Sequence, residues 1–254
     1  MTTSIPNDSY YFNQIPKNVS VSTTGVTFEL GVNVNLKYVF KLVKLNDVLL
    51  GMKYKNEVKQ CEEINMKISE KTFNNQLTMK LKIAEDKCVS VKIFLNGSIQ
   101  IAGSKSIEQI NKAIECLIKI LKKRFYVESL GEEIKLVDNY NFNIKDFKIN
   151  MINSNFYVNY KINIENLYPL ITKKGVKARF EPLSHRCVNI KFVPDGANDK
   201  DKPISIFVFE SGSIIITGAR NGNNIKAAYV FITNTLDENS LIIKRKDIKL
   251  YMNV

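Results

Sequence analysis

An internal repeat is the feature that most constrains the fold of this chain. Residues 93–113 read IFLNGSIQIAGSKSIEQINKA, and residues 208–228 read VFESGSIIITGARNGNNIKAA. Phe94 matches Phe209, an offset of 209 − 94 = 115. The identities that follow keep this offset without a gap: Gly97 and Gly212, Ser98 and Ser213, Ile99 and Ile214, Ile101 and Ile216, Gly103 and Gly218, Ile110 and Ile225, Ala113 and Ala228. The sequence therefore predicts two copies of one folding unit.

Hydrophobic periodicity predicts the same order of elements in both copies. In the first copy we expect strands near 19–34, 50–55 and 78–84, a hairpin at 89–103, and helices near 36–42 and 106–123. In the second we expect strands near 146–160, 176–181 and 186–193, a hairpin at 204–217, helices near 162–170 and 223–236, and a last strand at 241–250. Mostly antiparallel strands with one long helix per copy indicate an α+β fold, with one continuous sheet, helices on a single face and the other face available for a ligand.

The expected domain boundaries follow from the repeat. A flexible N-terminal arm is expected at 1–17, the first repeat at 18–125, a connector at 126–145, and the second repeat with its C-terminal strand at 146–254.

The charge balance indicates a polyanionic partner. The chain has 37 Lys and Arg against 25 Asp and Glu, a net charge of +12, which suits a nucleic acid or an anionic membrane surface. A solvated basic surface is the alternative. Four cysteines without a CxxC pair favour reduced thiols, and no apolar run approaches the roughly 20 residues of a membrane span, so a soluble intracellular protein is expected.

The composition offers little material for catalysis. With one histidine, a His-based metal site or a Ser-His-Asp triad is disfavoured. The sequence also shows no metal-ligand cluster, no phosphate-binding Gly loop and no nucleophile–base pair. We therefore expect neither an enzyme nor a cofactor.

Three motifs in order resemble the TATA-box-binding protein family, in particular its divergent forms in large DNA viruses. The segment FVFESGSIIITGAR (207–220) resembles the family's hairpin, FEPLSHRCVNIKF (180–192) its Tyr-Glu-Pro segment, and FKINMINSNFYVNYKINIENL (147–167) its first strand and short helix. The resemblance spans nearly the whole chain after residue 17 and is strongest in the second half. It implies a saddle: a curved antiparallel sheet with helices on its convex face, whose concave face binds the DNA minor groove. The resemblance further implies that apolar wedges are inserted between base steps and kink the duplex.

The resemblance implies aromatic wedges that unstack base steps. Phe94 and Phe209 occupy the family's hairpin wedge in both repeats, although a lone strand Phe is more often a core residue. The partner wedge falls on His185 in the second repeat, which is either a substitute stacking group or a turn residue. In the first repeat it falls near Gln76, with Phe73 close by.

The resemblance also implies cations that contact phosphates. Lys105 and Arg220 keep the cation that follows the family's Thr-Gly-Ala, and Lys82 and Lys191 stand where the family has arginines. The alternative for each is a solvated surface charge. The family's Ser-Gly-Lys lysine is replaced by Ser98 and Ser213, so one cation per repeat is missing.

The family's base-contacting residues are kept at some positions of this chain and replaced at others. Thr217 keeps the family's Thr, whereas the first repeat has Ala102; Gln100 and Ile215 replace family valines. The paired family Asn positions fall on Thr23 and Met151, and Asn150 and Asn153 flank the latter. Because a shift of one residue turns a strand side chain to the other face, the sequence leaves open whether either Asn substitutes. An A/T preference is expected through groove shape and deformability.

Two functions compete on this basis. The first is a viral TATA-box-binding-like initiation factor that binds double-stranded A/T-rich promoter DNA and recruits a factor of the transcription factor IIB type and RNA polymerase. Glu181 lies in the segment through which the family contacts that factor, although the next acidic position is Leu183. The second is a saddle-fold protein-interaction module with weak or no DNA bending. By resemblance, either acts in the nucleus or a cytoplasmic viral factory of an infected cell, or is packaged in the virion, without membrane partners.

Overall fold

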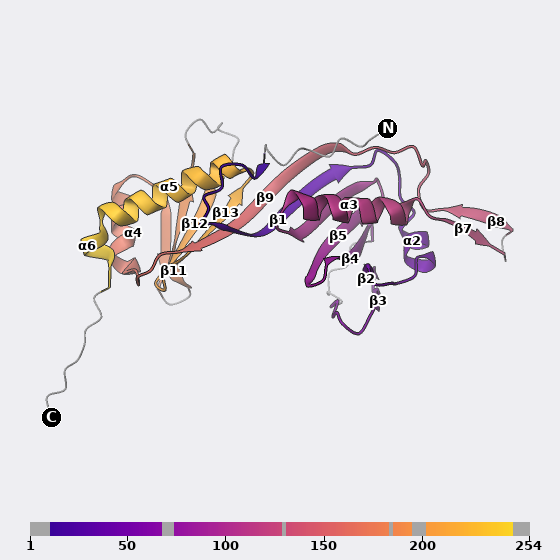
Figure 1. Ribbon diagram of the computed structural model, residues 1–254, viewed down its shortest axis with the longest axis horizontal. Coiled ribbons are helices and arrows are strands. Elements are labelled where there is room, and N and C mark those ends of the chain that lie inside the picture. The colour runs from indigo at the N-terminus through magenta and orange to yellow at the C-terminus, as the bar shows by residue number, and fades with distance from the viewer. Residues whose placement is uncertain (1–10, 68–73, 129–130, 183–184, 195–201, 246–254) are drawn as a thin grey trace, which may run out of the picture. The chain divides into compact units, whose positions relative to one another are not determined.

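The computed structural model describes residues 11–67, 74–128, 131–182, 185–194 and 202–245. They form two compact units: the first contains Thr23–Asn150, and the second contains Tyr11–Ser22 and the chain from Met151 onward. Each unit is an antiparallel sheet with helices, as shown in Figure 1. The α+β prediction is therefore confirmed for each unit.

The sheet of the first unit has the strand order β1-β6-β5-β4-β2-β3. Its elements are β1 (Ser20–Glu29), α2 (Leu36–Leu42), β2 (Leu49–Tyr54), β3 (Glu57–Gln60), β4 (Gln76–Ala84), β5 (Lys87–Phe94), β6 (Ser98–Ser104) and α3 (Ile107–Leu121). A separate two-stranded hairpin follows, formed by β7 (Arg124–Val127) and β8 (Glu132–Lys135).

The sheet of the second unit has the order β10-β11-β12-β13-β9. Its elements are β9 (Lys145–Tyr157), α4 (Ile164–Lys173), β10 (Ala178–Glu181), β11 (His185–Phe192), β12 (Ile204–Phe209), β13 (Ser213–Ala219), α5 (Gly222–Glu238) and α6 (Ser240–Ile243).

Three segments differ from the sequence prediction. Strand β3 was not predicted, and the expected connector begins with the β7–β8 hairpin. The last strand expected at 241–250 is wrong where it is described, because Ser240–Ile243 is helical; the remainder, from 246, lies outside the described residues. A three-residue apolar run such as Leu241–Ile243 does not by itself distinguish a short helix from a strand.

The two units share backbone details as well as element order. Asn35 and Asn163 cap α2 and α4 in the same way, each accepting a hydrogen bond from the backbone three residues later. The Leu30 amide donates to the Gly97 carbonyl (3.0 Å), as the Val158 amide does to the Gly212 carbonyl (3.0 Å). These contacts place the two hairpin turns equivalently and match residues 30 and 35 of the first unit to 158 and 163 of the second.

Glycines are required at two equivalent turns. Gly97 (φ +81°) and Gly212 (φ +86°) adopt the left-handed region that side chains disfavour. A Cβ on Gly212 would lie 2.6 Å from the Tyr160 carbonyl oxygen, and one on Gly97 would clash with the Val32 carbonyl oxygen. The repeated glycine of the hairpin therefore lets the turn approach the strand–helix connection of its own unit.

Helices cover one face of each sheet. In the first unit α2 and α3 pack on the face that buries alternate strand residues such as Val26, Met79 and Ile101. In the second unit the rings of Phe156 and Tyr229 on α5 meet edge to face at 4.8 Å, and Phe192 stacks on Phe231 at 4.9 Å. This burial is the main favourable term holding each unit together.

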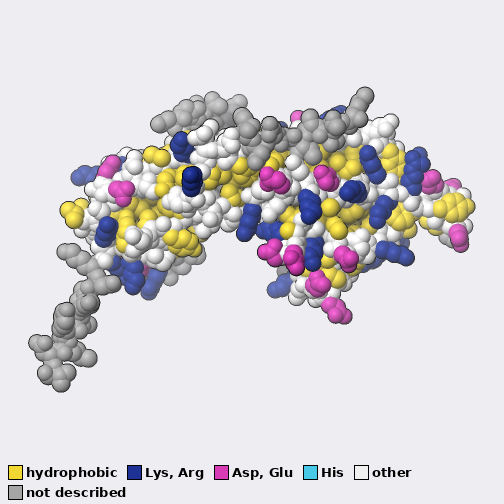
Figure 2. All heavy atoms as spheres, viewed as in Figure 1, with side chains coloured by type: hydrophobic (Ala, Val, Ile, Leu, Met, Phe, Trp, Pro, Cys, Tyr) yellow, Lys and Arg dark blue, Asp and Glu magenta, His cyan; other side chains and the backbone are white. Residues whose placement is uncertain are grey.

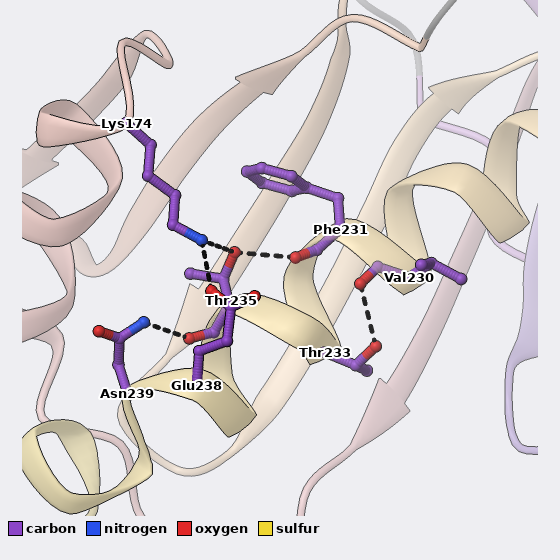
Figure 3. Close-up of polar contacts among 7 residues, drawn as sticks. All are labelled: Lys174, Val230, Phe231, Thr233, Thr235, Glu238 and Asn239. Atoms are coloured by element: carbon purple, nitrogen blue, oxygen red, sulfur yellow. Dashed lines mark hydrogen bonds and ion pairs between the residues drawn. The ribbon is translucent and has the colours of Figure 1, made fainter.

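A polar cluster joins α4 and α5 in the second unit (Figure 3). Lys174 Nζ lies 2.7 Å from Glu238 Oε2 and 3.5 Å from Thr235 Oγ1. Thr235 donates to the Phe231 carbonyl, and Asn239 Nδ2 donates to the Thr235 carbonyl (2.8 Å). The bond from Asn239 satisfies a carbonyl group in the last turn of α5, and the bonds from Lys174 join the C-terminal ends of α4 and α5.

Residues 11–17, expected to belong to a flexible arm, contact α5. Lys226 Nζ donates to Gln14 Oε1 (3.0 Å), and the neighbouring Asn18 Nδ2 donates to the Tyr229 hydroxyl (2.9 Å). The Asn13 carbonyl lies against Gly222, where any side chain would clash. The rest of the expected arm, residues 1–10, lies outside the described residues.

Candidate nucleic-acid interface

Each sheet has a second face on which none of the helices α2 to α5 packs; we call it the helix-free face. Strand alternation assigns its side chains, because residues directly opposite in an antiparallel pair share a face. In the first unit these are Thr23, Gly25, Thr27, Glu29, Gly51, Lys53, Val58, Gln60, Gln76, Thr78, Lys80, Lys82, Cys88, Ser90, Lys92, Phe94, Ser98, Gln100 and Ala102. In the second unit they are Asn153, Asn155, Tyr157, Arg179, Cys187, Asn189, Lys191, Ser205, Phe207, Phe209, Ser213, Ile215 and Thr217.

Both predicted wedge phenylalanines lie on this face. Phe94 ends β5 directly opposite Gln76, and Phe209 ends β12 directly opposite Cys187. Both rings are half-buried rather than part of the core. The backbone of His185 begins β11, two residues from Cys187, and Phe73 lies outside the described residues. The structure thus brings one aromatic ring to the hairpin end of each helix-free face.

The predicted cations fall into two groups. Lys82 and Lys191 lie on the helix-free faces of β4 and β11, and Lys191 Nζ donates to Ser205 Oγ at 2.6 Å. Lys105 and Arg220 are exposed and directly precede Ser106 and Asn221, the N-caps of α3 and α5. The second group therefore borders the sheet rather than lying on its face.

The predicted base-contacting residues are brought together in each unit. Gln100 and Thr23 lie on the first helix-free face, Gln100 directly opposite Thr27. Ile215 lies opposite Asn155 in the second. The Thr217 hydroxyl donates to the Asn153 carboxamide oxygen and also lies 3.7 Å from Met151 Sδ. Asn153 thus faces the same side as Thr217, which the sequence left open.

Sequence reasoning missed several residues of the same face. Lys80 lies opposite Ser90 and diagonal to Lys92, so together with Lys82 these lysines concentrate positive charge on β4 and β5. The spacing of two between Lys80 and Lys82 in 76-QLTMKLKIA-84 was the signal that could have found Lys80. On the face of α3 shown in Figure 2, by contrast, basic and acidic side chains are mixed.

The first helix-free face is bordered by a segment without a counterpart in the second unit. Residues 61–67 follow β3, and a Cβ on Gly51 would lie 2.7 Å from Ile64 Cδ1 and 2.8 Å from Met66 Sδ. Lys53 Nζ donates to the Lys67 carbonyl at 3.0 Å. This segment therefore covers β2 on the side opposite the helices.

Two side chains of the second unit, Tyr160 and Cys187, have raised pKa values. Burial raises the pKa of the Cys187 thiol, which keeps this thiol protonated at neutral pH beside Phe209. Burial, and secondarily the charge of Asp237, raises the pKa of the Tyr160 hydroxyl. Neither shift creates a charged group on the helix-free face.

Among the described residues, no group of three or more His, Cys, Asp and Glu side chains could hold a metal ion. No described helix is both long and apolar enough to cross a membrane.

Comparison with known proteins matches this geometry to one family. Residues 20–124 and 146–239 match the family described as "Transcription factor TFIID (or TATA-binding protein, TBP)". The chain is 34% identical over 243 residues to the "TATA-box-binding protein-like" protein of Acanthamoeba polyphaga mimivirus, covering 86% of this chain and 65% of that protein, so it spans just under two thirds of its relative. Among solved structures it is similar to Methanococcus jannaschii TBP, with a TM-score of 0.58 and 19% identity over 87% of this chain and 99% of that one. The predicted two-repeat α+β fold of this family is confirmed.

Proposed function

The chain belongs to the TATA-binding protein family, and from that premise we propose that it is a viral transcription initiation factor that binds A/T-rich double-stranded DNA in the minor groove through its two helix-free faces. Initiation factors of the transcription factor IIB type and RNA polymerase are its proposed partners, in the infected cell.

One observation carries the proposal. Matched positions of the two repeats, Phe94 with Phe209 and Lys80 with Lys191, lie on the face of each sheet that its helices leave uncovered. Lys80 lies opposite Ser90 as Lys191 lies opposite Ser205, so the strand register pairs Lys191 with Lys80 rather than with Lys82. A solvated basic surface would not require an aromatic ring at equivalent hairpin positions of both units. Apolar rings able to unstack base steps, together with lysines able to contact phosphates, are the chemistry that minor-groove binding needs.

Duplex titration at several salt concentrations tests the proposal. Phosphate contact releases counterions, so a protein that uses all six cations is expected to show a log–log salt slope of about −5. The six are Lys80, Lys82, Lys92, Lys191, Lys105 and Arg220. Absence of binding to an A/T-rich duplex at micromolar protein and low salt would overturn the proposal.

Native cysteines provide an independent measurement of the bound face. Cys88 lies on the first helix-free face, whereas Cys116 lies on α3. We expect a bound duplex to slow modification of Cys88 by a soluble maleimide while leaving Cys116 unchanged. Equal protection of both thiols, or protection of Cys116 alone, would place the duplex elsewhere.

A protein-interaction module with weak or no bending is the second candidate. It is favoured by Gln76, which lies opposite Phe94 where a second aromatic wedge would complete the pair. End-to-end fluorescence transfer on a labelled duplex separates the two functions: a bent duplex supports the initiation factor, whereas an unbent duplex with retained binding supports the module.

A further inference from the structure

A groove lies at the outer edge of the first unit, where the C-terminal end of α2, strand β3 and the start of β7 come together (Figure 1). It encloses about 1110 Å³, which exceeds the volume of most small-molecule pockets. It is lined by residues 41–45, residues 58–60, Lys123 and Phe125. A space of this size suits a segment of polypeptide better than a small molecule.

Two of the three walls have no counterpart in the second unit. Strand β3 extends the first sheet beyond β2, whereas no described strand extends the second sheet beyond β10. The β7–β8 hairpin follows α3, whereas the short helix α6 follows α5. The hairpin from Phe125 onward also lies between the two segments that match the family, which are 20–124 and 146–239. The groove is therefore a feature that neither the repeat nor the family match supplies.

Lys59 holds β3 against α2 and so builds one wall. Its Nζ donates to the Phe40 carbonyl at 2.8 Å and to the Lys41 carbonyl at 3.3 Å, both in the last turn of α2. The same ammonium group lies 4.8 Å from the centre of the Phe40 ring. The last carbonyls of a helix lack partners within it, so Lys59 satisfies them and its charge is compensated inside the protein.

Three other lysines of the groove keep their charge for a ligand. The side chains of Lys41, Lys44 and Lys123 are exposed, and none of them forms an ion pair or a hydrogen bond with a described residue. The neighbouring Arg124, by contrast, pairs with Glu133 at 3.3 Å. No described acidic residue lines the groove. Its charge is therefore positive and uncompensated.

Apolar side chains share the groove with these lysines. Leu42, Leu45, Val58 and Phe125 are each half-buried, so each has surface left to bury against a ligand. Nucleic-acid bases bind by stacking on aromatic rings, and the groove offers one ring among three aliphatic side chains. Leucine and valine instead suit the apolar residues of a peptide laid into a groove. The chemistry favours a protein segment over a nucleic acid.

We propose that this groove binds an acidic segment of a partner protein. The apolar side chains of that segment pack against the two leucines, Val58 and Phe125, and its carboxylates pair with Lys41, Lys44 and Lys123. Complementary charge selects this partner, because a neutral or basic segment would leave the three lysines unpaired or repelled. The inference goes beyond the proposed function, since none of these three lysines lies on a helix-free face.

Peptide display identifies the class of ligand without presuming its sequence. A library of random peptides is selected on the full chain and, in parallel, on a variant that combines Lys41→Glu, Lys44→Glu and Lys123→Glu. We expect the peptides recovered only on the wild type to be rich in Asp and Glu and to carry Leu or Phe. Recovered sequences without an acidic bias, equal recovery on the variant, or no recovery above background would overturn the proposal.

Fluorescence anisotropy with the most enriched peptide assigns the binding to residues. Lys44→Ala and Lys123→Ala should each weaken it by about threefold, with the loss shrinking at high salt. Phe125→Ala should weaken it by about tenfold, because it removes the largest apolar contact. Lys119→Ala on α3 is the control and should bind the peptide like the wild type. Unchanged affinity in all three groove variants would contradict the assignment. Circular dichroism checks folding; if Phe125→Ala is not folded, the variants of the exposed lysines decide.

Competition separates this site from a nucleic-acid site. An unlabelled single-stranded thymidine oligomer should leave the labelled peptide bound, and Phe125→Ala should keep the duplex affinity of the wild type. Displacement of the peptide by the oligomer, together with weaker oligomer binding in Lys44→Ala and Lys123→Ala, would assign the groove to nucleic acid and overturn the proposal. Because the peptide is measured without a duplex, failure of DNA binding leaves this test intact.

Discussion

The two helix-free faces use one backbone plan for different chemistry. The first carries Lys80, Lys82 and Lys92 with small side chains at Gly25 and Ala102. The second carries the aromatic residues Phe207 and Phe209, the apolar Ile215 and two asparagines, Asn153 and Asn155. The repeat therefore preserves strand register and turn geometry while the outward side chains diverge, because an outward residue is not constrained by the core. The first face carries more lysines, and the second carries more aromatic side chains.

The shared turn geometry is expected to be the most sensitive feature. Gly212→Ala should lower the free energy of unfolding by about 2 kcal/mol or more, since the left-handed φ penalises any Cβ and the Tyr160 carbonyl leaves it no space. Gly97→Ala should cost a similar amount. Urea denaturation measures both, with Gly25→Ala as the matched control at a glycine that has ordinary φ and no neighbour. A Gly212→Ala protein as stable as the control would contradict the turn assignment.

The aromatic rings come next in expected effect. Phe94→Ala and Phe209→Ala should each weaken duplex binding by about tenfold and reduce the bend, because each removes the ring available to unstack a base step. Fluorescence transfer across the duplex reports the bend, and Phe125→Ala on the β7–β8 hairpin is the control. If both variants bind and bend like the wild type, these rings are not wedges.

The lysines of the first face should act through charge alone. Lys80→Ala and Lys92→Ala are each expected to reduce the magnitude of the log–log salt slope by about 1, with the same loss for every duplex sequence. Lys119→Ala, in the last turn of α3, is the control and should leave the slope unchanged. A loss that depends on duplex sequence would instead make these lysines part of base readout.

The smallest expected difference distinguishes two cysteines. Because burial raises the pKa of Cys187, its thiolate is scarcer at a given pH than in an unfolded chain, so Cys187 should react with iodoacetamide more slowly than half-buried Cys88. The raised pKa also links stability to pH: its contribution is fully present below the pKa of the thiol in the unfolded chain and is lost as pH rises through the pKa in the folded protein. The free energy of unfolding measured with urea should therefore fall in the alkaline range. This fall should be smaller in Cys187→Ser. Mass spectrometry of each alkylated peptide provides the rates; faster reaction of Cys187 would contradict the prediction.

Much of the fold could be predicted because local signals agreed with the final structure. The predicted short helix at 36–42 coincides with α2, and the helices predicted near 106–123 and 223–236 correspond to α3 and α5, whose apolar residues recur at helical spacing. Strand β3 and the β7–β8 hairpin were missed because each of these strands has only four residues, too few to show a clear alternation. The Lys80–Lys92 cluster depends on the pairing of two strands, which composition does not reveal.

The sequence by itself determined that the protein is built from two related units, which glycines the turns need, and which family it belongs to, because periodic burial and left-handed backbone leave direct marks on residue choice. Only the tertiary structure decided which face Asn153 occupies and that its carboxamide oxygen accepts from Thr217. A β-bulge of one residue turns the following side chains of a strand to the opposite face, and the conformational preferences of single residues do not show where such a bulge lies.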